Sequence, residues 1–224
     1  MTFSLTGRCT RTGMFGIAIT TSSIAVASRC PWTRAGVGAV ATQNITNPAI
    51  GSKGLDLMAK GVSAKDALDQ VMKAEKFPAF RQVAFLGKSG APAHYSGAKT
   101  LGTNAAFAGK DSVGIGNLLA NTNVPKAMVE SFEGNASLNL GERLLRGLEA
   151  GLAAGGEMGP VKSCGLSLVS EHPWPICDLR VDWADQPITK LREIWTEFEP
   201  QMMTYVTRAI EPTSAPSYGV PGDP

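Results

Sequence analysis

The chain has 224 residues, of which 43% are hydrophobic and 18% are charged, and its formal net charge is +2. These values are typical of one large globular domain, and they exclude the strong field of a nucleic-acid-binding protein. The sequence has no basic run, no signal-peptide pattern and no apolar stretch of membrane-spanning length, so it predicts a soluble, cytoplasmic protein without nucleic-acid or membrane partners.

Short apolar runs separated by Gly and Thr begin the chain. They are rich in Ile, Val and Ala, and they predict four strands, at residues 3–8, 13–20, 24–30 and 36–43. Two helices are predicted next. The first covers residues 51–61, and the second begins after Ser63, an N-cap residue with Asp66 three positions later.

Strand and helix patterns alternate in runs through the rest of the chain. Four more strands are predicted at residues 82–87, 92–97, 104–108 and 112–116, followed by helices at 125–133 and 138–154. Two strands at 163–170 and 176–183 precede a final helix at 187–209. The Pro/Gly/Ser-rich residues 210–224 are predicted to form a surface-bound or disordered tail.

This order of elements indicates the fold class. Strands and helices occur in groups rather than in strict alternation, which disfavours a parallel doubly wound sheet. The sequence therefore predicts a single α+β domain over residues 1–209, in which two mainly antiparallel sheets pack face to face with helices outside each. This arrangement is a four-layer αββα sandwich.

Several kinds of site are excluded by the residues that are missing. There is no G-x-S-x-G elbow and no P-loop, and the four Cys and two His have no zinc-ligand spacing. The four Cys are interpreted as small buried hydrophobic residues. We therefore expect no metal and no cofactor.

The second residue is the strongest candidate for chemistry. If Met1 is removed, Thr2 carries a free α-amine beside its own hydroxyl, which places a base and a nucleophile on one residue. The ordinary pKa of an α-amine is about 7.7–8.0, so part of it is unprotonated at neutral pH. The alternative is that Thr2 only begins an ordinary strand.

Several blocks of the sequence resemble the domain of unknown function 1028 family, which is grouped with the N-terminal nucleophile (Ntn) hydrolases. The most specific are CPWTRAGVGAVATQ (30–43) and NPAIGSKGLDLM (47–58), and the resemblance covers about residues 2–195. Further matching blocks are GNLLAN (116–121), ERLLRGLEAGLAAGGE (142–157) and DLRVDWADQP (178–187). The resemblance implies an αββα sandwich. Relatives tend to carry Asp and then a basic run where this chain has residues 157–163, so its specificity can differ.

The resemblance suggests roles for other residues. Asn117 and Gln43, which lie in matching blocks, are candidates for the oxyanion donor, and Thr2 is expected at the floor of a cleft near them. Arg34, beside Trp32, is a candidate for holding a substrate carboxylate. Each of these side chains can also be a strand-end residue bonded to loop backbone.

The predicted activity is that of an Ntn amidohydrolase that cleaves a C–N bond in a small linear amide, ureido, carbamoyl or cyclic amide substrate. Two alternatives stay open: a non-catalytic binding or scaffold protein, and an enzyme with an internal nucleophile. For the latter, Ser22, Ser23 and Cys30 are candidates, and Ser22 is also a candidate substrate-binding residue. The apolar helices around 51–75 and 125–154 indicate a homodimer as the simplest assembly.

Overall fold

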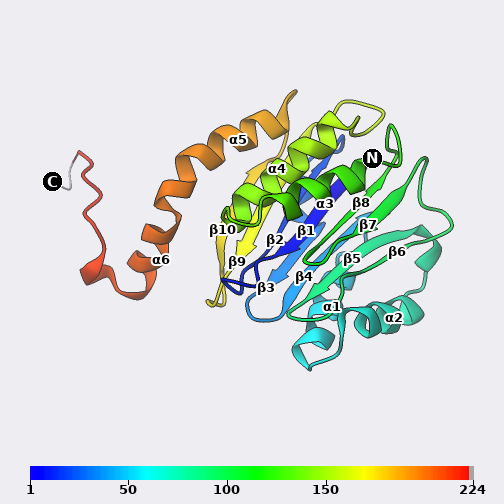
Figure 1. The fold of residues 1–224 in the computed structure, drawn as a ribbon, viewed down its shortest axis with the longest axis horizontal. Coiled ribbons are helices and arrows are strands. Elements are labelled where there is room, and N and C mark those ends of the chain that lie inside the picture. The colour runs from blue at the N-terminus through cyan, green and yellow to red at the C-terminus, as the bar shows by residue number, and fades with distance from the viewer. Residues whose placement is uncertain (222–224) are drawn as a thin grey trace.

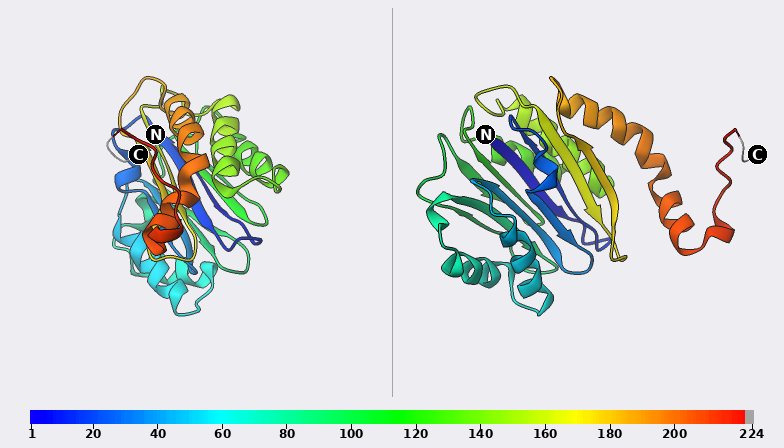
Figure 2. Two further views of the ribbon diagram at one scale, coloured as in Figure 1. Left: turned by 90° about the vertical axis from the view of Figure 1, so that its left-hand side faces the viewer. Right: turned by 180° about the vertical axis from the view of Figure 1, so that it is seen from behind.

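The computed structural model describes residues 1–221, which form two antiparallel β-sheets lying face to face with helices on both outer sides (Figures 1 and 2). One sheet has six strands and the other has four. The predicted α+β class and four-layer αββα arrangement are therefore confirmed.

One of the two central strands of the larger sheet is the first strand of the chain. This sheet has the strand order β10-β9-β2-β1-β8-β7, with β1 (Thr2–Arg8), β2 (Phe15–Thr21), β7 (Ala105–Ala108), β8 (Ser112–Asn117), β9 (Ser163–Val169) and β10 (Pro175–Val181). The smaller sheet has the order β3-β4-β5-β6, with β3 (Pro31–Arg34), β4 (Gly38–Asn44), β5 (Arg81–Gly87) and β6 (Ala93–Ser96).

The helices cover the outer faces of the two sheets. Those against the smaller sheet are α1 (Ala49–Ala59) and α2 (Ala64–Ala74), and those against the larger sheet are α3 (Val124–Gly134), α4 (Leu140–Ala153), α5 (Pro187–Phe198) and α6 (Met202–Ile210). As predicted, Ser63 caps α2 by accepting a hydrogen bond from the Asp66 N–H. Within residues 1–221, every helix is too short or too polar to cross a bilayer.

The strand predicted over residues 24–30 is wrong. Ala25 has φ 52°, in the left-handed region, and a 3₁₀ helix, η1 (Val26–Ser28), follows it. The Val26 N–H donates to Ser163 Oγ at 3.1 Å, and Ala27 packs so closely on β9 that a Cβ at Gly165 would lie 2.6 Å from it. These contacts replace strand pairing, and the strand forms later, at β3.

The single helix predicted over residues 187–209 is wrong in its continuity. It is divided into α5 and α6 by a 3₁₀ turn, η3 (Glu199–Gln201). Pro200 lies in this break, where its ring removes one N–H from the helical ladder and crowds the preceding turn. The chain after α6 extends beyond the sandwich (Figure 1), and residues 222–224 of the predicted tail lie outside the described residues.

Successive side chains of β1 point alternately to the helices and to the smaller sheet. Phe3 and Leu5 point to the layer of α3 and α4, where they belong to the outer core of the larger sheet. Thr2, Ser4 and Thr6 therefore point to the opposite face, toward the smaller sheet. Hence β1 presents a column of three hydroxyl groups to the space between the sheets.

We expect Gly147→Ala to destabilise the protein, because Gly147 lets α4 lie directly on β1. A Cβ there would stand 2.2 Å from Leu5 Cδ2 and 3.0 Å from the Met128 carbonyl oxygen. The strain should outweigh the gain in helix propensity and lower the free energy of unfolding by about 1–2 kcal/mol.

Urea unfolding checks this expectation against Gly134→Ala. Gly134 ends α3, and a Cβ there would meet nothing within 4 Å. The control should be neutral or up to about 1 kcal/mol more stable. Equal effects of the two substitutions would contradict the close packing of α4 on β1.

Candidate active site

Thr2 lies at the start of β1, between two strands that both pair with it. Its ladder partners are Thr21 of β2 and Asn117 of β8. The Thr2 Oγ1 donates to the Met1 carbonyl oxygen at 2.6 Å and lies 3.1 Å from Thr21 Oγ1. The Thr21 hydroxyl also donates to the Met1 carbonyl oxygen. Two hydroxyl groups thus converge on one carbonyl oxygen beside the candidate nucleophile.

Thr2 is only 7% exposed, and Met1 lies over it. The expected cleft is therefore closed while Met1 is present, and Thr2 is absent from the lining of the cavity described below. The side chain of Met1 lies against the segment after α4, because a Cβ at Gly159 would stand 3.2 Å from Met1 Cε.

A network of buried amides joins the two sheets next to Thr2. The Ser4 Oγ donates to Gln43 Oε1 at 2.7 Å, and Gln43 Nε2 donates to Gln82 Oε1 at 2.9 Å and to the Thr2 carbonyl oxygen at 3.3 Å. Asn117 Nδ2 donates to the same Gln82 oxygen at 3.0 Å. Among the described residues, Asn117 Oδ1 is buried without a hydrogen-bond partner.

The structure thus brings Thr2, Gln43 and Asn117 together. Two further residues, Gln82 and Thr21, belong to the same hydrogen-bond network and were not predicted. The strand register would have identified them, because Gln82 pairs with Gln43 across β4 and β5, and Thr21 pairs with Thr2.

Glu157 is a third participant that the sequence analysis did not place in the site. It is 6% exposed, and neither carboxylate oxygen has a hydrogen-bond partner among the described residues. Burial raises the pKa of this carboxyl to about 7, although the amino terminus and the nearby hydroxyl and N–H of Ser22 act to lower it. A buried carboxyl in this state changes its protonation near neutral pH.

The candidate internal nucleophiles differ in their surroundings. Ser22 is half-buried beside Glu157, and Ser23 is exposed. Cys30 is 2% exposed, its Sγ lies 3.6 Å from Thr46 Oγ1, and burial raises the pKa of its thiol above the usual value. Such a thiol is a poor nucleophile. All four cysteines are free and buried, as predicted.

Arg34 and Trp32 are not brought to Thr2. Trp32 pairs with Val40 in β3 and β4, and both side chains pack in the core under α1 and α2, on the outer face of the smaller sheet. Arg34 is two residues after Trp32 in β3, so its side chain points to the same outer face, where it forms an exposed ion pair with Asp56 of α1 at 2.8 Å. The inward face carries Ala41 and Gln43 instead.

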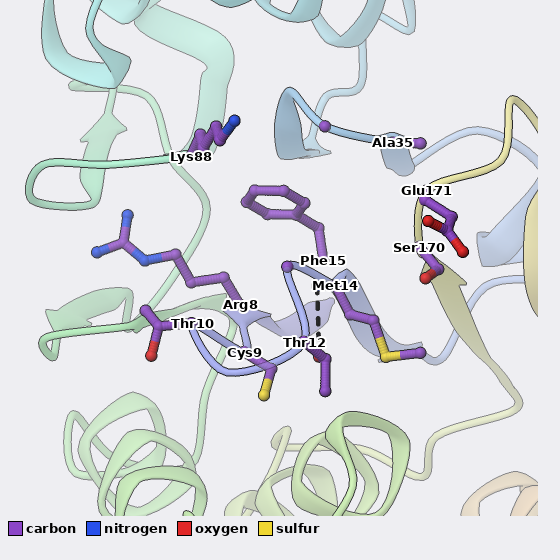
Figure 3. A pocket seen from close by; sticks show the side chains of 12 residues that line it. Arg8, Cys9, Thr10, Thr12, Met14, Phe15, Ala35, Lys88, Ser170 and Glu171 are labelled. Carbon is purple, nitrogen blue, oxygen red and sulfur yellow. Dashed lines mark hydrogen bonds between the residues drawn. The ribbon is translucent and has the colours of Figure 1, made fainter.

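A cavity of about 420 Å³ lies at the other end of β1 (Figure 3). It surrounds the β1–β2 turn and is lined by residues that include Met14, Phe15, Lys88 and Glu171. Arg8 also lines it, and its guanidinium donates to Asp111 Oδ1 at 2.9 Å. The length of β1 separates this cavity from Thr2 by about 20 Å, at roughly 3.3 Å per residue. Across residues 1–221, no group of His, Cys, Asp or Glu side chains is arranged to hold a metal ion.

Comparisons with known proteins extend these observations. The sequence model of a family of unknown function, DUF1028, matches residues 2–191. The crystal structure of protein SPO2555 from Silicibacter pomeroyi, described with the same family, is 26% identical with a TM-score of 0.82, and the match covers 88% of this chain and 85% of that one. Anbu (ancestral beta-subunit) from Yersinia bercovieri is 11% identical with a TM-score of 0.41, over 90% and 96% of the two chains. No curated protein matches the chain.

We expect Gln82→Leu to destabilise the protein, because Gln82 accepts from both Gln43 and Asn117 in a fully buried layer. Each donor left without a partner should lower the free energy of unfolding by about 1–3 kcal/mol. Gln70→Leu on the exposed face of α2 is the matched control and should change it by about 0.5 kcal/mol or less. Chemical denaturation measures both, and a tolerated Gln82→Leu would show that the network is dispensable.

Glu157→Gln should remove a pH dependence of stability. The pKa of Glu157 is raised to about 7 in the folded chain that retains Met1, against an ordinary value of 4.5. The unfolded state therefore loses this proton first, so the free energy of unfolding falls as pH rises from about 4.5 to 7. The stability of Glu157→Gln relative to the unsubstituted protein should rise by about 3 kcal/mol over this interval. A constant difference from pH 4.5 to 7.5 in urea titrations would contradict the raised pKa.

Proposed function

Because the chain belongs to DUF1028, a family of unknown function, we propose its activity from the chemistry at the start of β1. It is an N-terminal nucleophile hydrolase that cleaves the C–N bond of a small linear amide, ureido, carbamoyl or cyclic amide compound. Thr2 is its nucleophile once Met1 has been removed.

The convergence of two hydroxyl groups on the Met1 carbonyl oxygen carries this proposal. This oxygen accepts from Thr2 Oγ1 at 2.6 Å and from the Thr21 hydroxyl. The carbonyl group of a substrate entering the space left by Met1 has the same two hydroxyls available. Thr2 then stands beside a bound carbonyl, as a nucleophile must.

The reaction follows from the groups on Thr2. Its Oγ1 attacks the carbonyl carbon, and its free α-amine takes the hydroxyl proton and gives it to the leaving nitrogen. The acyl ester on Thr2 is then hydrolysed by water with the same amine as base. With an ordinary pKa of about 7.7–8.0, this amine is partly unprotonated at neutral pH.

The surrounding side chains support these steps. The hydroxyl of Thr21 and the second N–H of Asn117 Nδ2 are donors for the oxyanion, since Asn117 spends one N–H on Gln82 Oε1. Gln43 holds the start of β1 by donating to the Thr2 carbonyl oxygen at 3.3 Å. The buried amide network therefore fixes the nucleophile and a donor in one frame.

We expect Thr2→Ala to lower hydrolysis of a responsive substrate by at least about a thousandfold, since it removes the attacking atom. Thr2→Ser should retain part of the activity because it keeps both hydroxyl and amine. The assay applies purified protein, shown by intact mass to begin at residue 2, to a panel of small amides, ureido compounds and cyclic amides.

The matched control is Thr6→Val in the same strand and on the same face. The Thr6 hydroxyl is buried without a partner among the described residues, so its loss should leave activity and folding intact. Protein that keeps Met1 in its native host, or a Thr2→Ala variant with full activity, would favour the scaffold or internal-nucleophile alternatives.

A further inference from the structure

Glu157 lies near the amino terminus at the start of β1. Thr2 pairs with Asn117, the last residue of β8, and Glu157 forms a β-bridge with Leu119, two residues further along the chain. The amino terminus of Met1 acts on the Glu157 carboxyl, and Thr2 is the next residue. Removal of Met1 therefore opens space between the α-amine of Thr2 and the Glu157 segment.

Neighbouring backbone holds this segment in place from both sides. The Ala120 N–H donates to the Gly156 carbonyl at 3.0 Å, and the Met158 N–H donates to the Leu118 carbonyl at 3.1 Å. On the side of β2, the Lys162 N–H donates to the Thr21 carbonyl at 2.7 Å. The side chain of Glu157 is thus carried by backbone that is bonded to both strands flanking Thr2.

The elements around Glu157 offer its carboxylate no other cation. Residues 21–23 supply hydroxyl groups, and residues 117–119 supply an amide and two apolar side chains. Lys162, on its own segment, is engaged by Asp185 at the surface, at 2.5 Å. The charged group that acts on Glu157 is the amino terminus. A carboxylate that is 6% exposed, with Ser22 as the nearby uncharged donor, is stabilised by such a counter-charge.

We infer that Glu157 is a positioning residue that binds the α-amine of Thr2 after Met1 has left and shares a proton with it. This inference rests on the proposed function, because it assigns a partner to the catalytic base. The carboxyl is already close enough to feel the amino terminus of Met1, and the Thr2 amine lies one residue from it.

The pairing has a chemical consequence. In the resting site the carboxylate faces an ammonium group, and transfer of one proton from nitrogen to oxygen gives a carboxylic acid beside a free amine. Burial raises the pKa of Glu157 to about 7 in the chain that retains Met1, well above its ordinary 4.5, which brings the acid–amine form closer in free energy to the ion pair. The free amine then accepts the proton of the Thr2 hydroxyl.

The experiment titrates the α-amine itself, which needs no substrate. Protein beginning at Thr2 is acetylated with limiting reagent at a series of pH values, and acetylation of the Thr2 amine is quantified by peptide mass spectrometry. Glu157→Gln should lower the midpoint by about one pH unit or more, because a nearby carboxylate favours the ammonium form. Glu157→Asp should restore part of the shift.

The matched control is Glu133→Gln. Glu133 lies in α3, far from Thr2, and accepts a hydrogen bond from the Oγ of Ser112, the first residue of β8, at 2.7 Å. It removes the same charge and should leave the midpoint unchanged. A Glu157→Gln midpoint equal to that of the unsubstituted protein would overturn the inference.

A second measurement keeps Glu157 in place, so it tests the inference even if the Glu157→Gln variant fails to fold. The carbon-13 NMR signal of the Glu157 carboxyl is titrated in protein that begins at Thr2, before and after the Thr2 amine is acetylated. Its midpoint should rise by about one unit or more when acetylation removes the ammonium charge. An unchanged midpoint would also overturn the inference. Neither readout depends on hydrolysis, so an inactive Thr2 and an unpaired Glu157 give different results.

Discussion

The position of β1 between two other strands is the constraint on which the rest of the fold depends. Because β2 and β8 both pair with it, its side chains have only two directions available. The apolar residues Phe3 and Leu5 take the direction of the helices, and the hydroxyl residues take the direction of the second sheet. A shift of register by one residue would exchange these faces and bury three hydroxyls under α4.

The space between the sheets is consequently of two kinds. Toward the middle and the far end it is an apolar layer of Ile17, Ile19, Ala41, Ala84 and their neighbours. At the Thr2 end it is a layer of amides and hydroxyls in which Gln43 and Gln82 connect one sheet to Ser4 and Asn117 of the other. Hydrogen bonds fix direction in a way that apolar contacts do not, so this end of the sandwich has the better-defined geometry.

Local sequence patterns were sufficient for most of the fold and for the proximity of three residues of the candidate site. Short apolar runs and glycine turns located nine of the ten strands in the described residues, because segments such as β1, β2 and β5 are buried along their whole length. The pattern misled at residues 24–30, where the apolar side chains pack around a 3₁₀ turn against β9, and at Pro200, where one helix becomes two. Thr2, Gln43 and Asn117 were identifiable from their residue types and blocks. Gln82, Thr21 and Glu157 were not, because their positions depend on strand register and on a bridge to Leu119.

The separation along the chain between Met1 and Glu157 determines the order in which the parts of the candidate site are made during synthesis. Met1 is made well before Asn117 and Glu157, which enclose it. At roughly 5–20 residues per second, the ribosome takes on the order of 10–30 s to go from Met1 to Glu157. Through that interval the Met1–Thr2 peptide bond has no β8 beside it and no Glu157 segment near it, so it is not yet buried.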